Sequence, residues 1–384
     1  MCESKTKPNS NLFFTIRKKE ERWLLMSELN KNRVVMAMSG GVDSSLSAAL
    51  LKEQGYEVIG ITMKIWPSDE PPVDNEGGCA SLSAVEDARR VAYKLDIPFY
   101  VVNLEDIFGK TVIKNFKNEY AQGRTPNPCV YCNKVIKFGA LLKKAKELGA
   151  YYMATGHYAK IEQNSKGRYI LKRAADQAKD QTYMLYKMSQ NQLRHVLFPL
   201  AEYEKQDTRK LAREYNLKVY DKEESQEICF IPDDDYKRFL KEKYPKTAKV
   251  GPIIDVEGNR LGEHEGLPFY TIGQRRGLGL QDSKKWYVVE LDPDRNAVVV
   301  GDNEDVFEKE LIAEDLNWIS IKKLKEPKEV EAKIRYNTPP AKATIYPTGE
   351  EVKVVFSKPQ RAITPGQSVV FYDREVVVGG GIIK

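Results

Sequence analysis

The feature that most constrains the fold is a serine-rich double-glycine turn placed directly between an apolar run and a helical pattern. The run covers residues 34–38, the turn is Ser39-Gly40-Gly41, and the helical pattern starts at about Ser44 and ends at Gly55. A short, wholly apolar run is typical of a strand buried in a parallel sheet. A glycine after the last periodic residue is typical of a helix end. The chain is therefore expected to pass here from a buried strand into a helix through one tight turn.

The same alternation of strands and helices continues along the chain. Strands are expected at residues 58–65, 99–104 and 151–155, and helices at residues 83–95 and 133–148. Strands that alternate with helices of this length form a doubly wound parallel sheet. The fold class is therefore α/β for a first domain, which we expect at residues 33–231.

The remaining chain has a different pattern. Past about Asp233, glycines become frequent and the apolar pieces become short, which is typical of a β-rich module. Later strands are expected at residues 286–291, 298–300, 329–334, 351–356 and 368–372. This pattern predicts a small β-rich central domain at residues 232–283 and a C-terminal β-barrel at residues 284–384. Residues 1–32 lack sustained periodicity and are expected to be a mobile N-terminal extension.

Composition excludes several classes of protein. No apolar run approaches the ~18 residues that a membrane span needs, so no membrane association is expected. Five cysteines in 384 residues are too few for a disulfide scaffold, and the odd number favours a reducing, cytoplasmic location. The net charge of +6 permits a polyanionic partner without requiring one.

The turn after the first strand has the chemistry of a phosphate site. Gly40 and Gly41 let backbone amides approach an anion, and the helix that follows contributes its positive dipole end. Ser39, Ser44 and Ser45 add hydroxyl groups. The turn lacks the lysine with which other nucleotide loops bind a γ-phosphate. The bland alternative is an ordinary glycine-rich turn. The motif SGGVDSS resembles the pyrophosphatase-loop enzymes, which split ATP between its α- and β-phosphates and adenylate an oxygen of their substrate.

Three cysteines carry further chemistry. Cys129 and Cys132 form a Cys-x-x-Cys pair, and Cys229 stands alone in SQEICFIP. A zinc site lacks a second pair, and a thioredoxin-like redox motif belongs to another context. An iron–sulfur cluster on the three cysteines remains possible, as does sulfur transfer through a persulfide and a disulfide. Cys132 is expected where the 133–148 helix begins, a position that favours a thiolate.

Longer segments extend the resemblance. TPNPCVYCNKVIKFGALL, ATGHYAKI, KDQTYMLY, ESQEICFIPDDDY, GLPFYTIGQRRGLGL, RYNTPPAKA and ITPGQSVVFYDREVVVGGGII are similar, in order and spacing, to the tRNA-specific 2-thiouridylase family. The resemblance covers residues 33–383. Some members of that family carry Asp at the position of Cys129. The resemblance therefore implies that Cys129 is not the essential thiol, and this weakens the cluster interpretation.

The resemblance also implies roles for individual residues. Cys132 would be the nucleophile and Cys229 the persulfide carrier. The implied ATP contacts are Ala37, Met38, Ser39, Gly40, Gly41, Val42, Asp43, Ser44, Met63 and Gly156. The implied contacts with the target base are Asn127, Pro128 and Cys129. The implied tRNA contacts are His157, Lys179, Asp180, Gln181, Arg335, Tyr336 and Gln367.

Residue type alone supports the tRNA contacts only weakly. A lone histidine such as His157 is more often structural, and Lys179-Asp180-Gln181 would suit any polar loop. Arg335-Tyr336 combines a phosphate-pairing fork with a base-stacking ring, but such pairs are common in β-domains. Gln367 beside a glycine is typical of a turn. These assignments depend on the resemblance.

The expected reaction follows from the resemblance. ATP, with Mg²⁺, would adenylate the C2 oxygen of the wobble uridine in tRNA, with the Lys, Glu and Gln isoacceptors implied by the family. A cysteine desulfurase or sulfur-relay protein would load Cys229, and sulfur would displace AMP while Cys132 closes a disulfide with Cys229. No permanent metal is expected. The alternatives are a pyrophosphatase-loop ligase acting on a small molecule, and an RNA-binding protein whose loop no longer acts.

The stretch around Cys229 is expected to move. Polar residues precede and follow a short apolar group that consists of Ile228, Phe230 and Ile231. That group could cover the reacting base and exclude water, or swing out to collect sulfur. The bland alternative is a cysteine buried in a strand.

Overall fold

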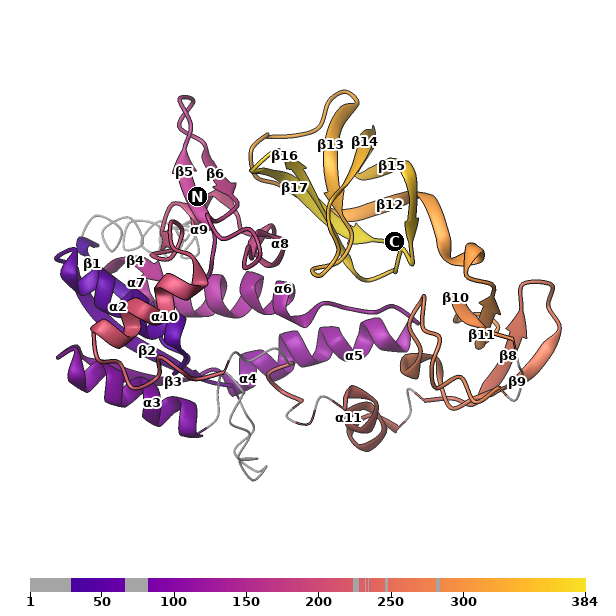
Figure 1. The fold of residues 1–384 in the computed structure, drawn as a ribbon, viewed down its shortest axis with the longest axis horizontal. Helices are drawn as coiled ribbons and strands as arrows, with labels where there is room; N and C mark the ends of the chain where they lie inside the picture. Colours follow the sequence, from indigo (N-terminus) through magenta and orange to yellow (C-terminus); the bar gives the residue numbers. More distant parts are fainter. Residues whose placement is uncertain are drawn as a thin grey trace, which may run out of the picture.

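The computed structural model describes residues 29–65, 82–223, 228–231, 233, 235–245, 248–280 and 284–384. Figure 1 shows an α/β domain, a small sheet at the opposite end of the molecule and a barrel above the helices that connect them. Most of the expected N-terminal extension, residues 1–28, lies outside the described residues. The first strand begins at Asn30, inside the range that was expected for the extension.

The α/β domain contains a five-stranded parallel sheet in the order β3-β2-β1-β4-β7. Its strands are β1 (Asn30–Ala37), β2 (Glu57–Lys64), β3 (Phe99–Asn103), β4 (Ala150–Ala154) and β7 (Val196–Leu197). The central strands are apolar on both faces, as parallel strands covered by helices must be. Val34, Val35 and Met36 of β1 are fully buried. The predicted doubly wound sheet is confirmed.

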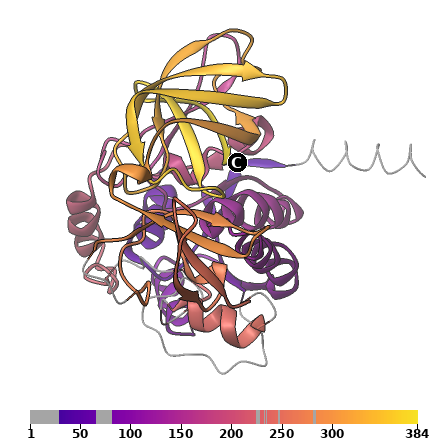
Figure 2. The same ribbon diagram turned by 90° about the vertical axis from the view of Figure 1, so that its right-hand side faces the viewer.

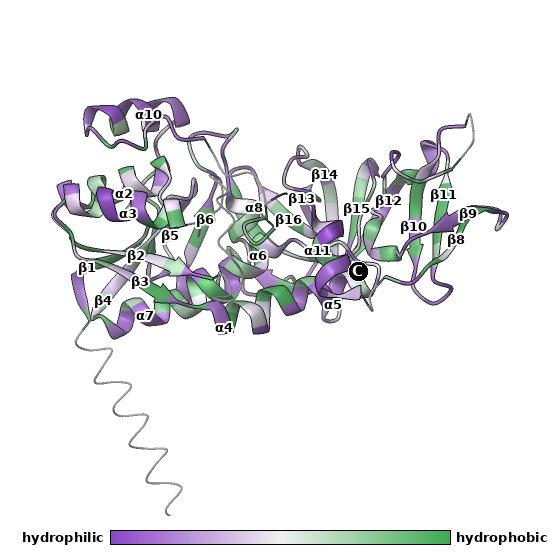
Figure 3. Cartoon of the chain, turned by 90° about the horizontal axis from the view of Figure 1, so that it is seen from below, coloured by the Kyte–Doolittle hydropathy of each residue, from purple (hydrophilic) through white to green (hydrophobic). Residues whose placement is uncertain are grey.

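Helices cover both faces of this sheet. Figure 3 shows α2 (Val42–Glu53) and α3 (Leu82–Lys94) on one face and α7 (Leu142–Glu147) on the other. Helix α10 (Lys205–Glu214) lies outside α2 and packs against it. Two short helices, α8 (Thr182–Leu185) and α9 (Gln190–Leu193), precede β7.

Two longer helical runs extend from the sheet toward the other domains (Figure 1). One run consists of α4 (Glu105–Phe108), the π-helical turn η1 (Gly109–Ile113) and α5 (Lys114–Ala121). The other consists of α6 (Pro128–Cys132), the π-helical stretch η2 (Asn133–Leu141) and α7. The second run starts five residues before the predicted helix, because Asn127 caps it and Pro128 occupies its first turn.

The central domain contains a four-stranded sheet in the order β10-β11-β8-β9. Its strands are β8 (Gly251–Asp255), β9 (Arg260–His264), β10 (Tyr287–Asp292) and β11 (Ala297–Gly301), and α11 (Tyr236–Lys243) and the short η4 (Leu267–Phe269) complete the domain. The sequence placed β10 and β11 in the C-terminal barrel. That placement is wrong, because β11 pairs in parallel with β8, and no local pattern reveals a parallel pairing across so many residues.

The C-terminal domain is a closed barrel, as predicted. Six strands follow one another in the order β12-β15-β14-β13-β16-β17, and β12 also pairs with β17. They are β12 (Phe307–Trp318), β13 (Lys328–Lys333), β14 (Ala341–Thr348), β15 (Glu351–Arg361), β16 (Ser368–Asp373) and β17 (Val376–Ile383), after the turn η5 (Glu304–Val306). Figure 2, seen from the side of the central sheet, shows the barrel stacked above it.

The three domains contact one another through a shared sheet edge and a shared apolar cluster. The hairpin of β5 (Lys160–Gln163) and β6 (Tyr169–Lys172) leaves the α/β domain and joins β17 of the barrel at Lys172 and Val376. One apolar cluster extends from Phe108 and Phe116 of the helical run to Ile253 and Val298 of the central sheet. In the part of the chain that the structure describes, no helix is long and apolar enough to traverse a membrane.

Candidate active site

The turn after β1 has a backbone that only glycine can supply. Gly40 has a φ of +72°, and a Cβ added to it would stand 2.2 Å from the carbonyl oxygen of Ala84 on α3. Gly41 follows in an extended conformation as the N-cap residue of α2. Because the first N–H groups of a helix have no acceptor inside the helix, the start of α2 is suited to binding an anion.

The serines of the turn bond to its own backbone. The Ser44 hydroxyl donates to the Gly41 carbonyl at 3.1 Å and accepts the Ser39 N–H at 3.2 Å. The Ser45 hydroxyl donates to the same carbonyl at 2.8 Å. These bonds fix the shape of the turn, so Ser44 acts on the loop geometry as well as being a possible phosphate donor.

The other expected ATP contacts surround this turn at the carboxyl edge of the sheet. Gly156 follows β4, and a Cβ added there would stand 2.7 Å from the Ser44 nitrogen. Met63 lies near the end of β2 and is half-buried. The contacts expected on the turn itself run without a break from the end of β1 into α2: Ala37, Met38, Ser39, Gly40, Gly41, Val42, Asp43 and Ser44. Parallel sheets bind ligands at this edge.

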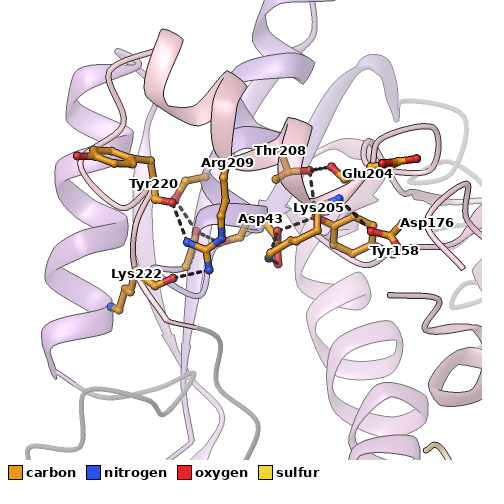
Figure 4. Close-up of polar contacts among 12 residues, drawn as sticks. Asp43, Tyr158, Asp176, Glu204, Lys205, Thr208, Arg209, Tyr220 and Lys222 are labelled. Atoms are coloured by element: carbon orange, nitrogen blue, oxygen red, sulfur yellow. Dashed lines mark hydrogen bonds and ion pairs between the residues drawn. The ribbon is translucent and has the colours of Figure 1, made fainter. Parts of the chain in front are cut away.

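Asp43 is held in a polar network that the sequence did not suggest (Figure 4). Both of its carboxylate oxygens accept from Lys205 Nζ, at 2.7 and 2.8 Å. The hydroxyl of Tyr158, which is buried, lies 3.0 Å from both Asp43 Oδ1 and Thr208 Oγ1. The network places a lysine ammonium beside the phosphate loop, although the loop itself contains no lysine.

Lys205 is the functional candidate that the sequence analysis missed. It is the first residue of α10, where a cation opposes the helix dipole. That unfavourable position is the one local signal of a partner elsewhere. Its backbone N–H donates to Asp176 Oδ2 at 3.0 Å, which caps the helix from the loop that leads to Lys179.

The cysteine pair lies within the first turn and a half of α6. Asn127 Oδ1 accepts the N–H groups of Cys129 and Val130, at 3.1 and 3.2 Å. Cys129 is exposed near the helix start, whereas Cys132 is buried one turn further in. The expectation that Cys132 stands where the helix begins is therefore wrong. The helix dipole acts mainly within the first turn, so it favours a thiolate at Cys129 more than at Cys132.

Cys132 and Cys229 lie in the same apolar cluster. Cys132 is among its buried members, and Cys229 and Met63 pack against it. Cys229 is half-buried in a turn that the Ile231 N–H closes by donating to the Ile228 carbonyl at 2.8 Å. It is not in a strand, so the bland alternative for this cysteine does not describe it.

Phe230 anchors the Cys229 turn. It is buried, and its ring lies 5.6 Å from that of Phe108, 5.2 Å from that of Phe116 and 5.7 Å from that of Phe239. Edge-to-face aromatic pairs at such distances are favourable beyond their buried area. This residue of the apolar group thus packs against the helical run α4–α5, and the expectation that the group covers the reacting base stays a prediction.

His157 is half-buried and uncharged. Its Nδ1 lies 2.6 Å from Thr155 Oγ1, and its ring lies 6.0 Å from the ring of Phe138 and from that of Phe198. Burial, assisted by the nearby charge of Lys137, holds the pKa of His157 well below 6.5. The imidazole can therefore accept or donate a hydrogen bond, but it brings no positive charge to a phosphate at neutral pH.

Lys179, Asp180 and Gln181 have different environments. Asp180 is buried, which raises its pKa, and its carboxylate accepts from Thr182 Oγ1 at 2.7 Å. Gln181 Oε1 accepts the Tyr158 N–H at 3.0 Å. Lys179 is partly exposed. The acid and the amide therefore shape the loop, and Lys179 is the one cation of the three, which suits it to an anionic ligand.

Arg335 and Gln367 connect parts of the chain. Arg335 Nη2 lies within hydrogen-bond distance of the Ile272 and Ala362 carbonyls and of Thr364 Oγ1, at 3.2, 2.9 and 2.5 Å. Burial lowers the pKa of Arg335. Gln367 Nε2 donates to the Thr125 carbonyl at 2.8 Å and so ties the barrel to the segment before α6.

The barrel and the start of α6 enclose a small cavity of about 140 Å³. Asn127 lines it together with Lys134, Lys187 and Asp315 of the facing elements. The residues expected to contact the target base, Asn127, Pro128 and Cys129, thus occupy one helix start beside the barrel.

Tyr336, the neighbour of Arg335, is half-buried, and its ring lies 6.1 Å from that of Tyr183.

Among the described residues, no group of three or more His, Cys, Asp or Glu side chains is arranged to hold a metal ion. Cys129 is exposed while Cys132 is buried. This arrangement offers no support for a cluster bound by the three cysteines.

Family models match almost the whole chain. Residues 32–233 match the model described as the tRNA methyl transferase HUP domain, residues 237–302 the tRNA methyl transferase PRC-barrel domain, and residues 308–383 the aminomethyltransferase beta-barrel domain. Together with the parallel sheet and the glycine turn after β1, they define the class of protein: a HUP-domain protein that carries two β-domains.

Sequence relatives define the family within that class. The tRNA-specific 2-thiouridylase MnmA of Halothermothrix orenii is 60% identical over 354 residues, which cover 92% of this chain and 99% of the relative. The protein of the same name from Clostridium acetobutylicum is 58% identical, with 93% and 100% covered. The chain belongs to the tRNA-specific 2-thiouridylase family.

Two solved structures that resemble the chain are more distant relatives. The U34-tRNA thiolase NcsA from Methanococcus maripaludis, with its [4Fe-4S] cluster, has a TM-score of 0.34 at 18% identity and covers 60% of this chain and 75% of that chain. A 4-thiouridine synthetase in complex with RNA and ATP has a TM-score of 0.33 at 18% identity, with 56% and 51% covered.

Proposed function

We propose that this protein synthesises 2-thiouridine in tRNA. ATP adenylates the C2 oxygen of the wobble uridine and releases pyrophosphate, and sulfur from a cysteine persulfide then displaces AMP. The observation that supports the proposal is that Cys132 belongs to one apolar cluster and that Cys229 and Met63 pack against the same cluster, although the three residues are distant in sequence. The identity of the relatives supports the same substrate.

The phosphate loop and its neighbours would perform the first step. The start of α2 would receive the pyrophosphate group, and Lys205 would add a positive charge beside it. Mg²⁺ is commonly held by one or two carboxylates together with phosphate oxygens. Asp43 would be its protein ligand, and the ion would neutralise charge on the phosphates.

The cysteines would perform the second step. A donor leaves Cys229 as a persulfide. If its terminal sulfur attacks C2 directly, AMP departs, and the Cys132 thiolate then attacks the Cys229 sulfur, forming the disulfide and freeing the thiocarbonyl. If Cys132 attacks first, hydrosulfide is released and displaces AMP. Both routes end with a Cys132–Cys229 disulfide, which an external reductant must open.

The tRNA would lie along the side of the α/β domain that faces the barrel. Lys179, Tyr336 and the uncharged His157 would be direct contacts, because an ammonium group, an aromatic ring and an imidazole suit the phosphates and bases of RNA. Asp180, Gln181, Arg335 and Gln367 bond to other parts of the chain. These four would hold the contacting loops in place. The flipped uridine would meet Asn127, Pro128 and Cys129 at the start of α6.

A single-turnover reaction with unmodified tRNA, ATP and a persulfide donor tests the proposal. Mass analysis of tRNA nucleosides should detect 2-thiouridine, and the products should be AMP and pyrophosphate. Cys229→Ser should still adenylate tRNA but should not thiolate it from the persulfide donor. Without reductant, the wild type should yield a linked Cys132–Cys229 peptide.

Two outcomes would contradict the proposal. Iron that co-purifies stoichiometrically, together with the absence of the linked peptide, would replace the disulfide mechanism with a cluster mechanism. Full activity of a Cys132→Ala, Cys229→Ala double variant would assign the protein to the pyrophosphatase-loop ligases that act on small molecules.

A further inference from the structure

We propose that Arg209 is a positioning residue for Cys229: it fixes the chain that leads to the sulfur carrier onto the same helix that contacts the phosphate loop. This inference rests on the proposed function, because it assigns to Arg209 a role in the sulfur-transfer step alone.

Arg209 binds the backbone that follows α10. Its Nη1 donates to the Tyr220 carbonyl at 2.9 Å and its Nη2 to the Lys222 carbonyl at 3.0 Å (Figure 4). A guanidinium presents its donors as a rigid planar fork, so two such bonds fix both the position and the direction of the bound segment. Arg213 reinforces the contact from the next turn, with its guanidinium carbon 4.8 Å from the centre of the Tyr220 ring.

The same segment is fixed from a second side. Lys222 Nζ lies 2.6 Å from Asp87 Oδ2 on α3, and both side chains are about three-quarters buried, at 23% and 24% exposed. An ion pair that is largely shielded from solvent holds its geometry better than a surface pair. The carbonyl and the side chain of Lys222 are therefore held by two different helices.

Lys222 determines how far Cys229 can travel. Cys229 lies seven positions after Lys222, and seven chain steps span at most about 25 Å. On its other side Cys229 is followed directly by Phe230, which is buried among three aromatic rings. The carrier thiol is thus tethered at both ends, and the Arg209 clamp is the tether on the N-terminal side.

Helix α10 connects this clamp to the site of adenylation. Lys205, one turn before Arg209, binds Asp43 of the phosphate loop. Thr208 and Ala212 are buried on the inner face of the helix, and α10 packs along α2. One rigid helix therefore carries both the lysine beside the phosphate loop and the arginine that binds the segment before Cys229. The start of the Cys229 segment is thereby held at a constant distance from the adenylation site.

Removal of the fork should separate the two half-reactions. In Arg209→Gln, single-turnover adenylation of tRNA, measured as pyrophosphate release, should stay within about twofold of the wild type. Transfer of sulfur from a persulfide-loaded cysteine desulfurase should slow at least tenfold, and sodium sulfide should restore thiolation, since it bypasses Cys229. Arg209→Lys keeps the charge but loses the fork, so it should resemble Arg209→Gln. Lys210→Gln, at an exposed position on the same helix, is the matched control and should behave as the wild type.

A measurement without tRNA or ATP isolates the positioning effect. In glutathione redox buffers, the effective concentration of the Cys132–Cys229 thiol pair should fall at least tenfold in Arg209→Gln and should not change in Lys210→Gln. Equal slowing of adenylation and transfer, with a lowered Tm, would assign Arg209 to ordinary packing and overturn the inference. So would an unchanged effective concentration in an Arg209→Gln variant that transfers sulfur normally. A wild type that forms neither 2-thiouridine nor the linked peptide would instead contradict the proposed function itself.

Discussion

Close approach at single glycines shapes the nucleotide site. Gly156 stands so near the phosphate loop that a Cβ would meet the Ser44 nitrogen at 2.7 Å and the Asp43 carbonyl carbon at 2.8 Å. Both neighbours are backbone atoms, so the contact cannot be relieved by rotating a side chain. The glycine therefore holds the loop at a fixed distance from the end of β4.

Gly156→Ala should disturb the loop more than it disturbs the fold. The added methyl should cost about 1–3 kcal/mol of unfolding free energy, and the displaced loop should lower the rate of tRNA adenylation by about tenfold or more, since 1.4 kcal/mol corresponds to a factor of ten. Gly109→Ala is the control, because a Cβ there meets no atom within 4 Å and its φ is −61°. Equal adenylation by both variants would contradict the assignment.

The hydrogen bonds of Arg335 inside the protein change the expectation that its side chain contacts an RNA phosphate. A phosphate contact through this side chain would lower the salt dependence of tRNA binding by about one charge when the residue is removed. Since Nη2 is directed to the Ile272 and Ala362 carbonyls and Thr364 Oγ1, we expect Arg335→Ala to lower the Tm and to leave the salt slope unchanged. Binding measured between 50 and 200 mM salt checks this, and a slope reduced by one would restore the phosphate contact.

The residues of the site differ in how well the sequence could predict them. Ser39 to Ser44 form a contiguous motif whose function depends on local backbone geometry, so their arrangement was predictable. Lys205 acts through Asp43, and the two meet only because α10 packs on α2. No periodicity or spacing encodes that contact. Contacts that depend on tertiary packing, such as those of Arg209 with the Tyr220 carbonyl and of Gln367 with the Thr125 carbonyl, were hidden for the same reason.

At the scale of elements, strand and helix types were predictable and their ends were less so. Four of the five strands of the parallel sheet are short apolar runs, and their expected positions are confirmed within four residues. The two-residue strand β7 was not expected. The helix that carries Cys132 begins at Pro128, because the Asn127 side chain caps it. A proline at the first turn and a capping residue before it are local signals that could have moved the prediction by five residues.

The turn between α8 and α9 should titrate in a distinctive way. Lys187 is buried against the barrel, where its Nζ lies 2.6 Å from Asp315 Oδ2, and burial lowers its pKa from 10.5 to about 8. Between pH 8 and 10.5 the unfolded chain therefore binds a proton that the folded chain has lost, and the unfolding free energy contributed by this group should rise with pH by about 3 kcal/mol.

Urea unfolding of the wild type and of Lys187→Met at several pH values tests this. Other groups titrate in the same range, so the difference between the two proteins is the informative quantity. That difference should grow in favour of the wild type as the pH rises from 8 to 10.5. A difference that stays constant would show that Lys187 keeps an ordinary pKa at the domain interface.

At the scale of the whole molecule, domain types were predictable and domain connections were not. The barrel was recognisable from regularly spaced strands. The hairpin β5–β6 extends the barrel sheet from the α/β domain, and β11 pairs in parallel with β8. Such pairings join residues that are far apart in sequence, and their register follows from packing rather than from composition. The sequence therefore indicated the types of domain, but it did not indicate which strands pair between distant parts of the chain.

Acid should destabilise the whole molecule through its histidines. The three histidines, His157, His195 and His264, all have pKa values lowered by burial. Below pH 6.5 the unfolded chain binds protons that the folded chain rejects, so stability falls as the pH falls. Each histidine contributes up to about 1.4 kcal/mol per pH unit. Urea unfolding at pH 5.5 and 7 should show the loss of unfolding free energy, and this loss should be smaller in His264→Gln. An identical loss in that variant would exclude His264 as a contributor.

Because Phe230 is buried, the rate of sulfur supply depends on the fraction of enzyme molecules in which Cys229 is open to a donor. In the proposed reaction, any excursion of Cys229 to meet a donor outside the molecule exposes Phe230, which costs about 1.5–3 kcal/mol. That energy corresponds to an open form about ten to a hundred times rarer than the closed one. A donor that binds only the open form meets a small fraction of the enzyme at any moment. When the donor is scarce, the turnover of the enzyme is therefore governed by how often this one ring leaves its pocket, and the adenylated tRNA waits for its sulfur.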